Sequence, residues 1–401
     1  FSLEDAQHIR WKVPVPGLGL SCPVIWDNRV IITTAIGEGD QAGYRTGMYG
    51  DIEPVEDTSV HSWRVICLNL RSGEFLWNRE AHRGVPQVKR HPKSSHANTT
   101  VATDGSRIIA FFGSEGLYCY NMNGDLLWKR DFGLIRSAWN VVESAEWEFS
   151  SSPVIFKDQV IIQADALNTS FVAVLDLFTG ETIWRQERDE ISGWCTPNVY
   201  FDGSRPVIAV NGYKHRGGYD LVTGEEVWKM SGGGDVPVPT PVIWKDLLYF
   251  NSAHGRHAPL MAIKNSARGV IPYPENENQP DDAFEWFYDR MGAYMTSVLV
   301  YDSLLYRLRW NGNLACFEAG TGKLIYESTL RPTSFIACPV AADQRIYAVS
   351  EEGELFVVKA GRKFELLERV PLGEPSLVTP AIAEGVMVLR TSRHLIAVSD
   401  H

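Results

Sequence analysis

The sequence predicts an all-β fold: a single eight-bladed β-propeller of four-stranded antiparallel blades that spans residues 1–401 as one domain. Three observations predict it. An apolar strand, a Gly turn and a strand that ends in a large aromatic residue recur along the chain at roughly 40–58-residue spacing, which is the length of a propeller blade. Each repeat holds three or four short apolar segments. The last repeat lacks one strand, and a spare strand of the same kind lies at the N-terminus.

The recurring phrase has a physical interpretation. It reads LNLRSGEFLW at 68–77, YNMNGDLLW at 120–128, LDLFTGETIW at 175–184, YDLVTGEEVW at 219–228 and FEAGTGKLIY at 317–326. The Gly suits the left-handed position of a tight turn, where a side chain would clash. The aromatic residue offers a large apolar area on a rigid frame. We therefore expect Trp77, Trp128, Trp184 and Trp228 to be largely buried between neighbouring blades.

The blades follow one another along the whole chain. We expect them at about 21–81, 96–133, 151–189, 194–233, 238–290, 294–330, 335–373 and 376–400. The eighth has only three strands. The segment HIRWKVPVPG at 8–17 supplies the fourth, with Trp11 in the aromatic place, and this pairing closes the ring and removes its exposed edges. A seven-bladed ring is the alternative.

Two insertions interrupt the rhythm of the repeats. Residues 37–62 enlarge a loop between the second and third strands of a blade, called B and C, and residues 265–284 enlarge a loop between strands C and D. Because the chain direction alternates, B–C loops share one face with the D–A loops that connect blades. The first insertion should therefore lie over the face that carries the D–A loops, and the second should lie opposite.

Composition excludes several classes of protein. The formal net charge of −11 gives no electrostatic support for binding nucleic acid or an anionic membrane. No run approaches the roughly 20 apolar residues that span a bilayer. The six cysteines form no CxxC motif and are expected to be buried free thiols. The chain starts at Phe1, which indicates either a cleaved signal peptide or an artificial boundary.

Several loop phrases extend the pattern beyond the bare repeat. They include RHPKSSHANTTVATDG at 90–105, RDEISGWCTP at 188–197 and GGGDVPVPTP at 232–241. With the repeat itself, they resemble the pyrroloquinoline-quinone-like, or BamB-like, β-propeller repeat family, and in particular its exported bacterial branch. The resemblance implies a periplasmic or secreted location. It also implies two functions, a protein-interaction scaffold or a quinone-dependent oxidoreductase.

The oxidoreductase branch has features that can be checked in this sequence. Its members resemble one another in an adjacent Cys-Cys disulfide above the quinone, a Trp below it, and Glu, Asn and Asp near a Ca²⁺. This chain has no adjacent cysteines and is shorter than those enzymes. We therefore expect no cofactor, and pyrroloquinoline quinone with Ca²⁺ is disfavoured.

Polar and aromatic residues gather in the loops expected on the face of the first insertion. Loops from eight blades converge around one axis, so such residues can line a shared pocket. The candidates for catalysis are His96, Arg188, His254 and Tyr294, and the candidates for ligand binding are Asp165, Trp194, Asp235, Arg390 and His394. Each also has a purely structural interpretation, such as a turn-capping Asp235 or an ion-pair cluster around Arg188.

This mixture of side chains suits a polar, ring-shaped ligand such as a glycan. Aromatic rings stack on the apolar faces of sugars, while Asp and Arg bind hydroxyls or uronic carboxylates. An enzyme of this kind would be a lyase, in which Arg188 neutralises a carboxylate and His96 or His254 exchanges the proton with help from Tyr294. No metal is expected, because His254 and His257 alone are weak evidence for a site. A glycan-binding protein, a protein scaffold with a partner on one propeller face, and a quinone-dependent oxidoreductase remain the competing classes.

Overall fold

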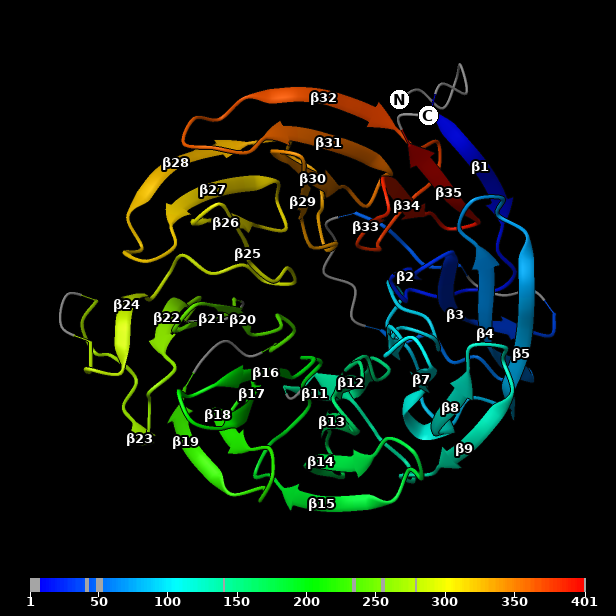
Figure 1. Cartoon of the computed structure of the whole chain (residues 1–401), viewed down its shortest axis with the longest axis horizontal. Coiled ribbons are helices and arrows are strands. Elements are labelled where there is room, and N and C mark those ends of the chain that lie inside the picture. Colours follow the sequence, from blue (N-terminus) through cyan, green and yellow to red (C-terminus); the bar gives the residue numbers. More distant parts are fainter. Residues whose placement is uncertain are drawn as a thin grey trace.

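The computed structural model describes residues 8–39, 43–47, 53–139, 141–232, 236–253, 257–277 and 280–399. Viewed down its shortest axis, the chain forms a ring of radially arranged sheets, with the chain running once around the ring (Figure 1). One short 3-10 helix, Gly113–Glu115, is the helical element in the described ranges. No helix among these residues is long and apolar enough to cross a membrane.

The first four blades follow the first half of the chain. Blade 1 consists of β2 (Val24–Trp26), β3 (Arg29–Gly37), β4 (His61–Asn69) and β5 (Phe75–Gly84). Blade 2 consists of β6 (Ala102–Thr103), β7 (Arg107–Phe111), β8 (Leu117–Asn121) and β9 (Leu126–Arg130). Blade 3 consists of β12 (Val154–Phe156), β13 (Gln159–Asp165), β14 (Ser170–Asp176) and β15 (Thr182–Glu187). Blade 4 consists of β16 (Asn198–Phe201), β17 (Pro206–Val210), β18 (His215–Asp220) and β19 (Glu226–Ser231).

The remaining blades complete the ring. Blade 5 consists of β20 (Val242–Trp244), β21 (Leu247–Asn251), β22 (Leu260–Lys264) and β24 (Phe284–Tyr288). Blade 6 consists of β25 (Leu299–Tyr301), β26 (Leu304–Leu308), β27 (Asn313–Glu318) and β28 (Leu324–Thr329). Blade 7 consists of β29 (Val340–Ala342), β30 (Arg345–Val349), β31 (Glu354–Lys359) and β32 (Leu366–Pro371). Blade 8 consists of β33 (Ala381–Ala383), β34 (Val386–Arg390), β35 (His394–Ser399) and β1 (Ile9–Pro14).

The predicted closure of the ring is confirmed. Strand β1 pairs antiparallel with β35, with Trp11 opposite Ala397 and Pro14 opposite His394. Trp11 is buried in an apolar cluster that joins blade 8 to blade 1. Every other junction between adjacent blades has a comparable cluster, so the core lies between the sheets rather than at the centre of the ring. The eight-bladed prediction is therefore correct.

The recurring phrase locks one blade to the next at the rim. Trp128, on outer strand β9 of blade 2, donates its indole N–H to the Leu177 carbonyl of blade 3 at 3.0 Å. Gly180 in the turn that follows has φ of 72°, and a Cβ there would lie 2.6 Å from the Trp128 ring. Gly is therefore required both by the backbone and by the ring of the preceding blade. Trp11, Trp77, Trp184 and Trp286 make the same indole contact with the next blade.

Burial of the four predicted tryptophans varies. Trp77 and Trp228 are buried, and Trp128 and Trp184 are partly buried. Trp228 departs from the pattern because it donates to the Tyr200 hydroxyl of its own blade at 2.9 Å. The second insertion explains the difference. It forms β23 (Gly269–Ile271), which pairs parallel with β19 and places Gly269 opposite Trp228 as a fifth strand of that sheet.

Candidate functional site

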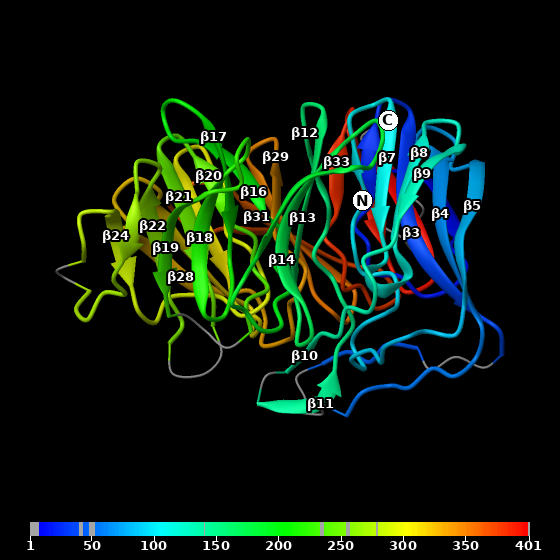
Figure 2. The same ribbon diagram turned by 90° about the horizontal axis from the view of Figure 1, so that it is seen from below.

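A layer of non-repeating chain covers blades 1 to 3 on the face where D–A and B–C loops lie (Figure 2). This face layer consists of residues 53–60 of the first insertion, residues 85–98, and residues 134–139 and 141–150, which include the hairpin of β10 (Ala138–Trp139) and β11 (Val142–Glu146). Val55 and Arg90 form an antiparallel bridge. The main-chain N–H of Glu148 donates to the Lys89 carbonyl at 3.0 Å. The layer thus joins segments that are far apart in the sequence.

His96 lies at the centre of the face layer. Its Nδ1 is 2.6 Å from Glu148 Oε2, and its Nε2 is 3.1 Å from Asp57 Oδ2. Its side chain is only 2 % exposed. Burial alone would lower the pKa of His96, but hydrogen bonds and charges from Asp57 and Glu148 outweigh it and raise the pKa to about 9. His96 therefore carries a proton at neutral pH.

Further side chains hold this centre in place. Arg90 is buried, and its Nε donates to Asp57 Oδ2 at 2.7 Å. Burial would raise the pKa of Asp57, but the contacts with His96 and Arg90 hold it well below its usual range. The ring centroid of His61, at the start of β4, lies 5.3 Å from that of His96. Trp63 donates its indole N–H to the His96 carbonyl at 2.8 Å.

Glu148 has an unusual backbone conformation. Its φ of 43° is in the left-handed region, which non-Gly residues rarely adopt and which recurs at functional sites. Its Oε1 accepts a hydrogen bond from the Phe149 N–H at 2.9 Å, while Oε2 faces His96. Nearby Glu115 is also buried, and burial together with the charge of Glu148 raises its pKa to about 8. The region is therefore rich in carboxylates that water does not solvate.

An aromatic row lies beside the Glu148 backbone. The rings of Trp139 and Trp147 are nearly parallel, at 9° and 6.1 Å between centroids. Trp147 lies 5.7 Å from Trp194 and meets His91 edge-on at 5.1 Å. Trp194 donates its indole N–H to the Glu148 carbonyl at 3.0 Å. Trp139 and Trp147 are each partly exposed, so protein only partly covers the row beside Glu148.

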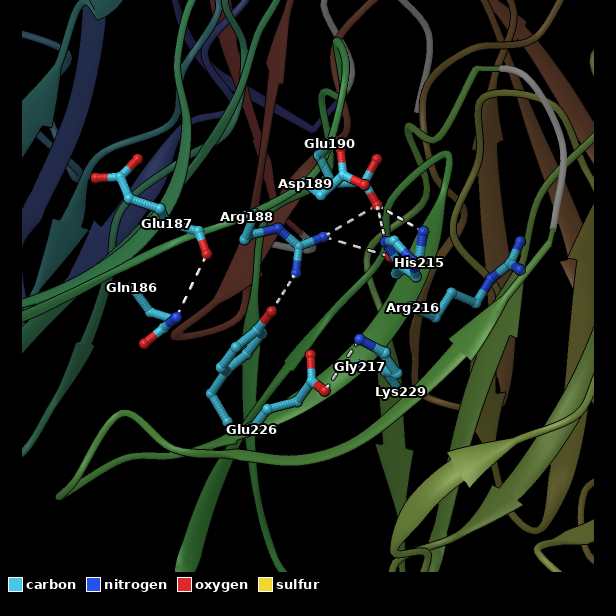
Figure 3. Close-up of a pocket in the computed structure, with 11 residues that line it drawn as sticks. Gln186, Glu187, Arg188, Asp189, Glu190, His215, Arg216, Gly217, Glu226 and Lys229 are labelled. Carbon is cyan, nitrogen blue, oxygen red and sulfur yellow. Dashed lines mark hydrogen bonds and ion pairs between the residues drawn. The ribbon is translucent and has the colours of Figure 1, made fainter.

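Arg188 and Asp165 form a second buried network, between blades 3 and 4. Arg188 donates to Asp165 Oδ1 at 2.9 Å and to the Tyr219 hydroxyl at 3.0 Å. It also lies 3.4 Å from Glu190 (Figure 3). Burial raises the pKa of Asp165 and of Glu190 although Arg188 lies beside them. A cavity of about 230 Å³ adjoins this network at the ends of β15, β18 and β19. Of the nine candidate residues, Arg188 lines this cavity.

The other candidates lie elsewhere or outside the described residues. Arg390 is buried, donates to the Ser21 carbonyl at 2.9 Å, and has its pKa lowered by burial to about 10. His394 Nδ1 lies 2.7 Å from Glu374. Tyr294 is partly buried in the loop between β24 and β25. Asp235 and His254 fall outside the described residues. The structure thus brings His96 and Trp194 together on Glu148 and pairs Asp165 with Arg188, while Arg390 and His394 lie in blade 8.

Part of the first insertion also reaches the blades that precede blade 1 in the ring. The Gly47 N–H donates to Glu351 of blade 7 at 2.9 Å, and Lys93 donates to the same carboxylate at 2.6 Å. The Tyr44 hydroxyl donates to the Pro375 carbonyl at 3.3 Å. The insertion therefore extends from blade 1 to blades 7 and 8 on this face.

The His96 centre consists of His96 and the four residues around it, and these four were not among the nine candidates from sequence: Asp57, His61, Arg90 and Glu148. Asp57 and His61 belong to the insertion, where no repeat marks a special position. The spacing of an acid and a histidine four residues apart was the available signal, and it is weak on its own. Their meeting with His96 depends on how the insertion packs against residues 85–98.

Comparison with known proteins agrees with this architecture. The family described as outer membrane protein assembly factor BamB matches residues 61–285. BamB from Moraxella catarrhalis superposes with a TM-score of 0.58 at 13 % identity, covering 91 % of this chain and 98 % of that chain. No curated protein sequence matches this chain significantly.

Two other solved structures share the fold. The quinohemoprotein alcohol dehydrogenase from Comamonas testosteroni has a TM-score of 0.62 at 11 % identity, covering 98 % of this chain and 76 % of that chain. The computationally designed Ika8 protein has a TM-score of 0.59 at 13 % identity, covering 90 % of this chain and 98 % of that chain. At these identities, the solved structures show a shared fold and nothing more. The match to the BamB family, in contrast, is a match in sequence and covers more than half of the chain. The chain therefore belongs to the BamB-like family of β-propellers.

Proposed function

We propose that this protein is an extracytoplasmic binding propeller that holds a polar, ring-shaped ligand such as a glycan on its insertion-bearing face. The observation that carries the proposal is the partly exposed row of Trp139 and Trp147 beside the carboxylates of the His96 centre. Flat aromatic rings accept the apolar face of a sugar. The extracytoplasmic location is supported by membership of a family described as an outer-membrane assembly factor.

Binding is favoured over turnover by the state of the two best candidates for catalysis. His96 is protonated at neutral pH and lies between two carboxylates, so it is not poised to abstract a proton. Arg188 already contacts Asp165, Tyr219 and Glu190, so a ligand carboxylate would have to displace one of them. For a lyase activity, His96 would have to lose its contacts with the two carboxylates, and Arg188 would have to release one of its partners.

The test is ligand binding with a matched pair of tryptophan variants. Neutral and uronic oligosaccharides are screened by thermal shift, where a ligand at about 100 times its Kd stabilises by roughly 2.7 kcal/mol. Trp147→Ala should weaken binding of a hit by about tenfold, which corresponds to about 1.4 kcal/mol. Trp310→Ala is the control, because Trp310 is also exposed but lies in a loop of blade 6. Equal affinity in both variants would reject the aromatic row as the site.

A protein-interaction scaffold is the second candidate, and the rim favours it. Apolar side chains of the outer strands are exposed in several blades, including Leu76 on β5, Leu127 on β9 and Ile183 on β15. Exposed apolar side chains on the rim are a feature that a protein partner would cover. Leu76→Asp with Leu127→Asp should release a partner that crosslinks to the wild-type rim, while Trp147→Ala should retain it. The opposite pattern would point to the face layer instead.

We also propose that no pyrroloquinoline quinone binds, because the residues present do not fit it. The six cysteines stand singly in the sequence, so an adjacent disulfide cannot form above a quinone. The Trp194 ring lies 5.7 Å from the Trp147 ring, and its indole N–H bonds the Glu148 carbonyl. Reconstitution with the quinone and Ca²⁺ should therefore leave no stoichiometric visible absorption band after gel filtration.

A further inference from the structure

We propose that Asp57, His61 and His96 bind a divalent transition-metal ion, for which Zn²⁺ is the best match. One ligand atom from each of the three lies within 4.8 Å of those from the other two. Two imidazole nitrogens and one carboxylate oxygen form a set of donors that Zn²⁺ accepts. Three protein ligands leave a fourth position for water or a ligand oxygen. The inference does not rest on the proposed glycan binding.

The two imidazole rings are held as metal-binding histidines usually are. His96 Nδ1 is 2.6 Å from the Glu148 carboxylate, and His61 Nδ1 is 2.9 Å from the Ser59 carbonyl. In the neutral tautomer that donates at Nδ1, each ring carries its lone pair on Nε2. A carboxylate or carbonyl on the other ring nitrogen is the usual outer-shell partner of a metal-bound histidine, because it fixes the tautomer and ring orientation.

The Asp57 carboxylate is also fixed in place, by a hydrogen bond from a buried arginine. Arg90 Nε donates to Asp57 Oδ2 at 2.7 Å, and the Arg90 side chain is 1 % exposed. His96 Nε2 faces the same oxygen at 3.1 Å, so the ion would replace the proton that this nitrogen shares with Asp57. Once the ion has replaced that proton, the carboxylates of Asp57 and Glu148 outnumber the Arg90 cation. The surroundings therefore favour added positive charge.

Direct titration with Zn²⁺ tests the site in the full chain. Protein dialysed against a chelator and then against metal-free buffer is titrated with Zn²⁺ by calorimetry, and bound zinc is counted by elemental analysis. We expect one ion per chain, and a loss of affinity of more than about 100-fold in His61→Gln. His394→Gln is the matched control, because His394 also contacts a carboxylate on this face at 2.7 Å. It should bind Zn²⁺ as the wild type does.

Two further measurements separate ligation from folding. Asp57→Asn preserves shape and should also abolish tight binding, while Glu148→Gln should weaken it by about 10–100-fold, as loss of an outer-shell partner does. Co²⁺ in place of Zn²⁺ should give the visible absorption of a four-coordinate site in the wild type and in His394→Gln, but not in His61→Gln. Melting curves of the metal-free variants identify any that do not fold.

Three results would overturn the assignment. They are no binding of Zn²⁺ or Co²⁺ to the folded wild type, unchanged affinity in folded His61→Gln and Asp57→Asn, and binding of Ca²⁺ in preference to Zn²⁺. None of these results depends on a sugar ligand, so failure of the metal site and failure of the proposed glycan binding can be told apart.

Discussion

Two of the histidine–carboxylate contacts on the insertion-bearing face of the propeller have different surroundings. His96 Nδ1 is 2.6 Å from Glu148, and His394 Nδ1 is 2.7 Å from Glu374. The His96 side chain is 2 % exposed and meets a second carboxylate, whereas the His394 side chain is 26 % exposed. The same pair of groups is thus enclosed at one place and open to solvent at the other.

The difference comes from what carries each pair. His394 and Glu374 belong to the loops of blade 8, where Glu374 also accepts a hydrogen bond from Thr391 and faces Lys12 of the closing strand. His96 and Glu148 belong to the face layer, which has no counterpart in the described loops of the other blades. The repeat therefore produces contacts that hold the ring together, and the added layer produces an enclosed, titratable centre. The following variants test this distinction, from the largest expected effect to the smallest.

Arg90→Met should have the largest effect, about 3–5 kcal/mol of unfolding free energy. Arg90 is buried, and its removal leaves Asp57 with His96 as its remaining cationic partner and the Ser94 carbonyl without its donor. Urea unfolding followed by tryptophan fluorescence measures the loss. A cost below about 1 kcal/mol would mean that the face layer contributes little to stability.

Trp63→Phe should cost about 1–3 kcal/mol. Trp63 is fully buried, and its indole N–H is the donor to the His96 carbonyl at 2.8 Å. Phe retains part of the ring but leaves that carbonyl unpaired and some volume unfilled. The same urea titration measures the effect. If Trp63→Phe were neutral, the backbone of His96 would not depend on blade 1 as the structure indicates.

Glu374→Gln should change how the free energy of unfolding depends on pH in the acid range. Burial would raise the pKa of Glu374, but Thr391, His394 and Lys12 lower it below the ordinary value. A lowered carboxyl pKa stabilises the folded state above the unfolded pKa, near 4.3, and this contribution is lost as the pH falls through the folded pKa. Stability of the variant should therefore decline less between about pH 5 and pH 3 than that of the wild type. An equal decline of the unfolding free energy in variant and wild type would contradict a lowered pKa for Glu374.

Lys12→Met should have the smallest effect, within about 1 kcal/mol. Lys12 Nζ is 4.0 Å from Glu374, and its side chain is 38 % exposed, so solvent screens the pair. Comparing its loss of unfolding free energy with that of Arg90→Met shows how much more a buried ion pair contributes to stability than an exposed one. Equal costs for the two variants would remove the distinction between the face layer and the closing blade.

Much of the fold could be predicted from the sequence because local patterns, repeated in each blade, determine it. The Gly turns and the aromatic ends of outer strands mark each blade, and the spare strand with Trp11 indicated how the ring closes. What could not be predicted is that the Trp of one blade contacts the Gly turn of the next. That contact joins two repeats through space, and at Trp228 it is replaced by Tyr200 and β23.

The site was less accessible to sequence reasoning. His96 and Trp194 could be selected because they stand in polar, aromatic loops that interrupt apolar repeats. Asp57 and His61 could not, because an insertion has no periodicity from which a facing residue can be inferred. Composition and local pattern determined the blades, their closure and the face on which polar loops gather. Only tertiary packing decided that Val55 pairs with Arg90, and this contact places Asp57 beside His96. Contacts between non-repeating segments depend on three-dimensional packing, which short-range sequence patterns do not encode.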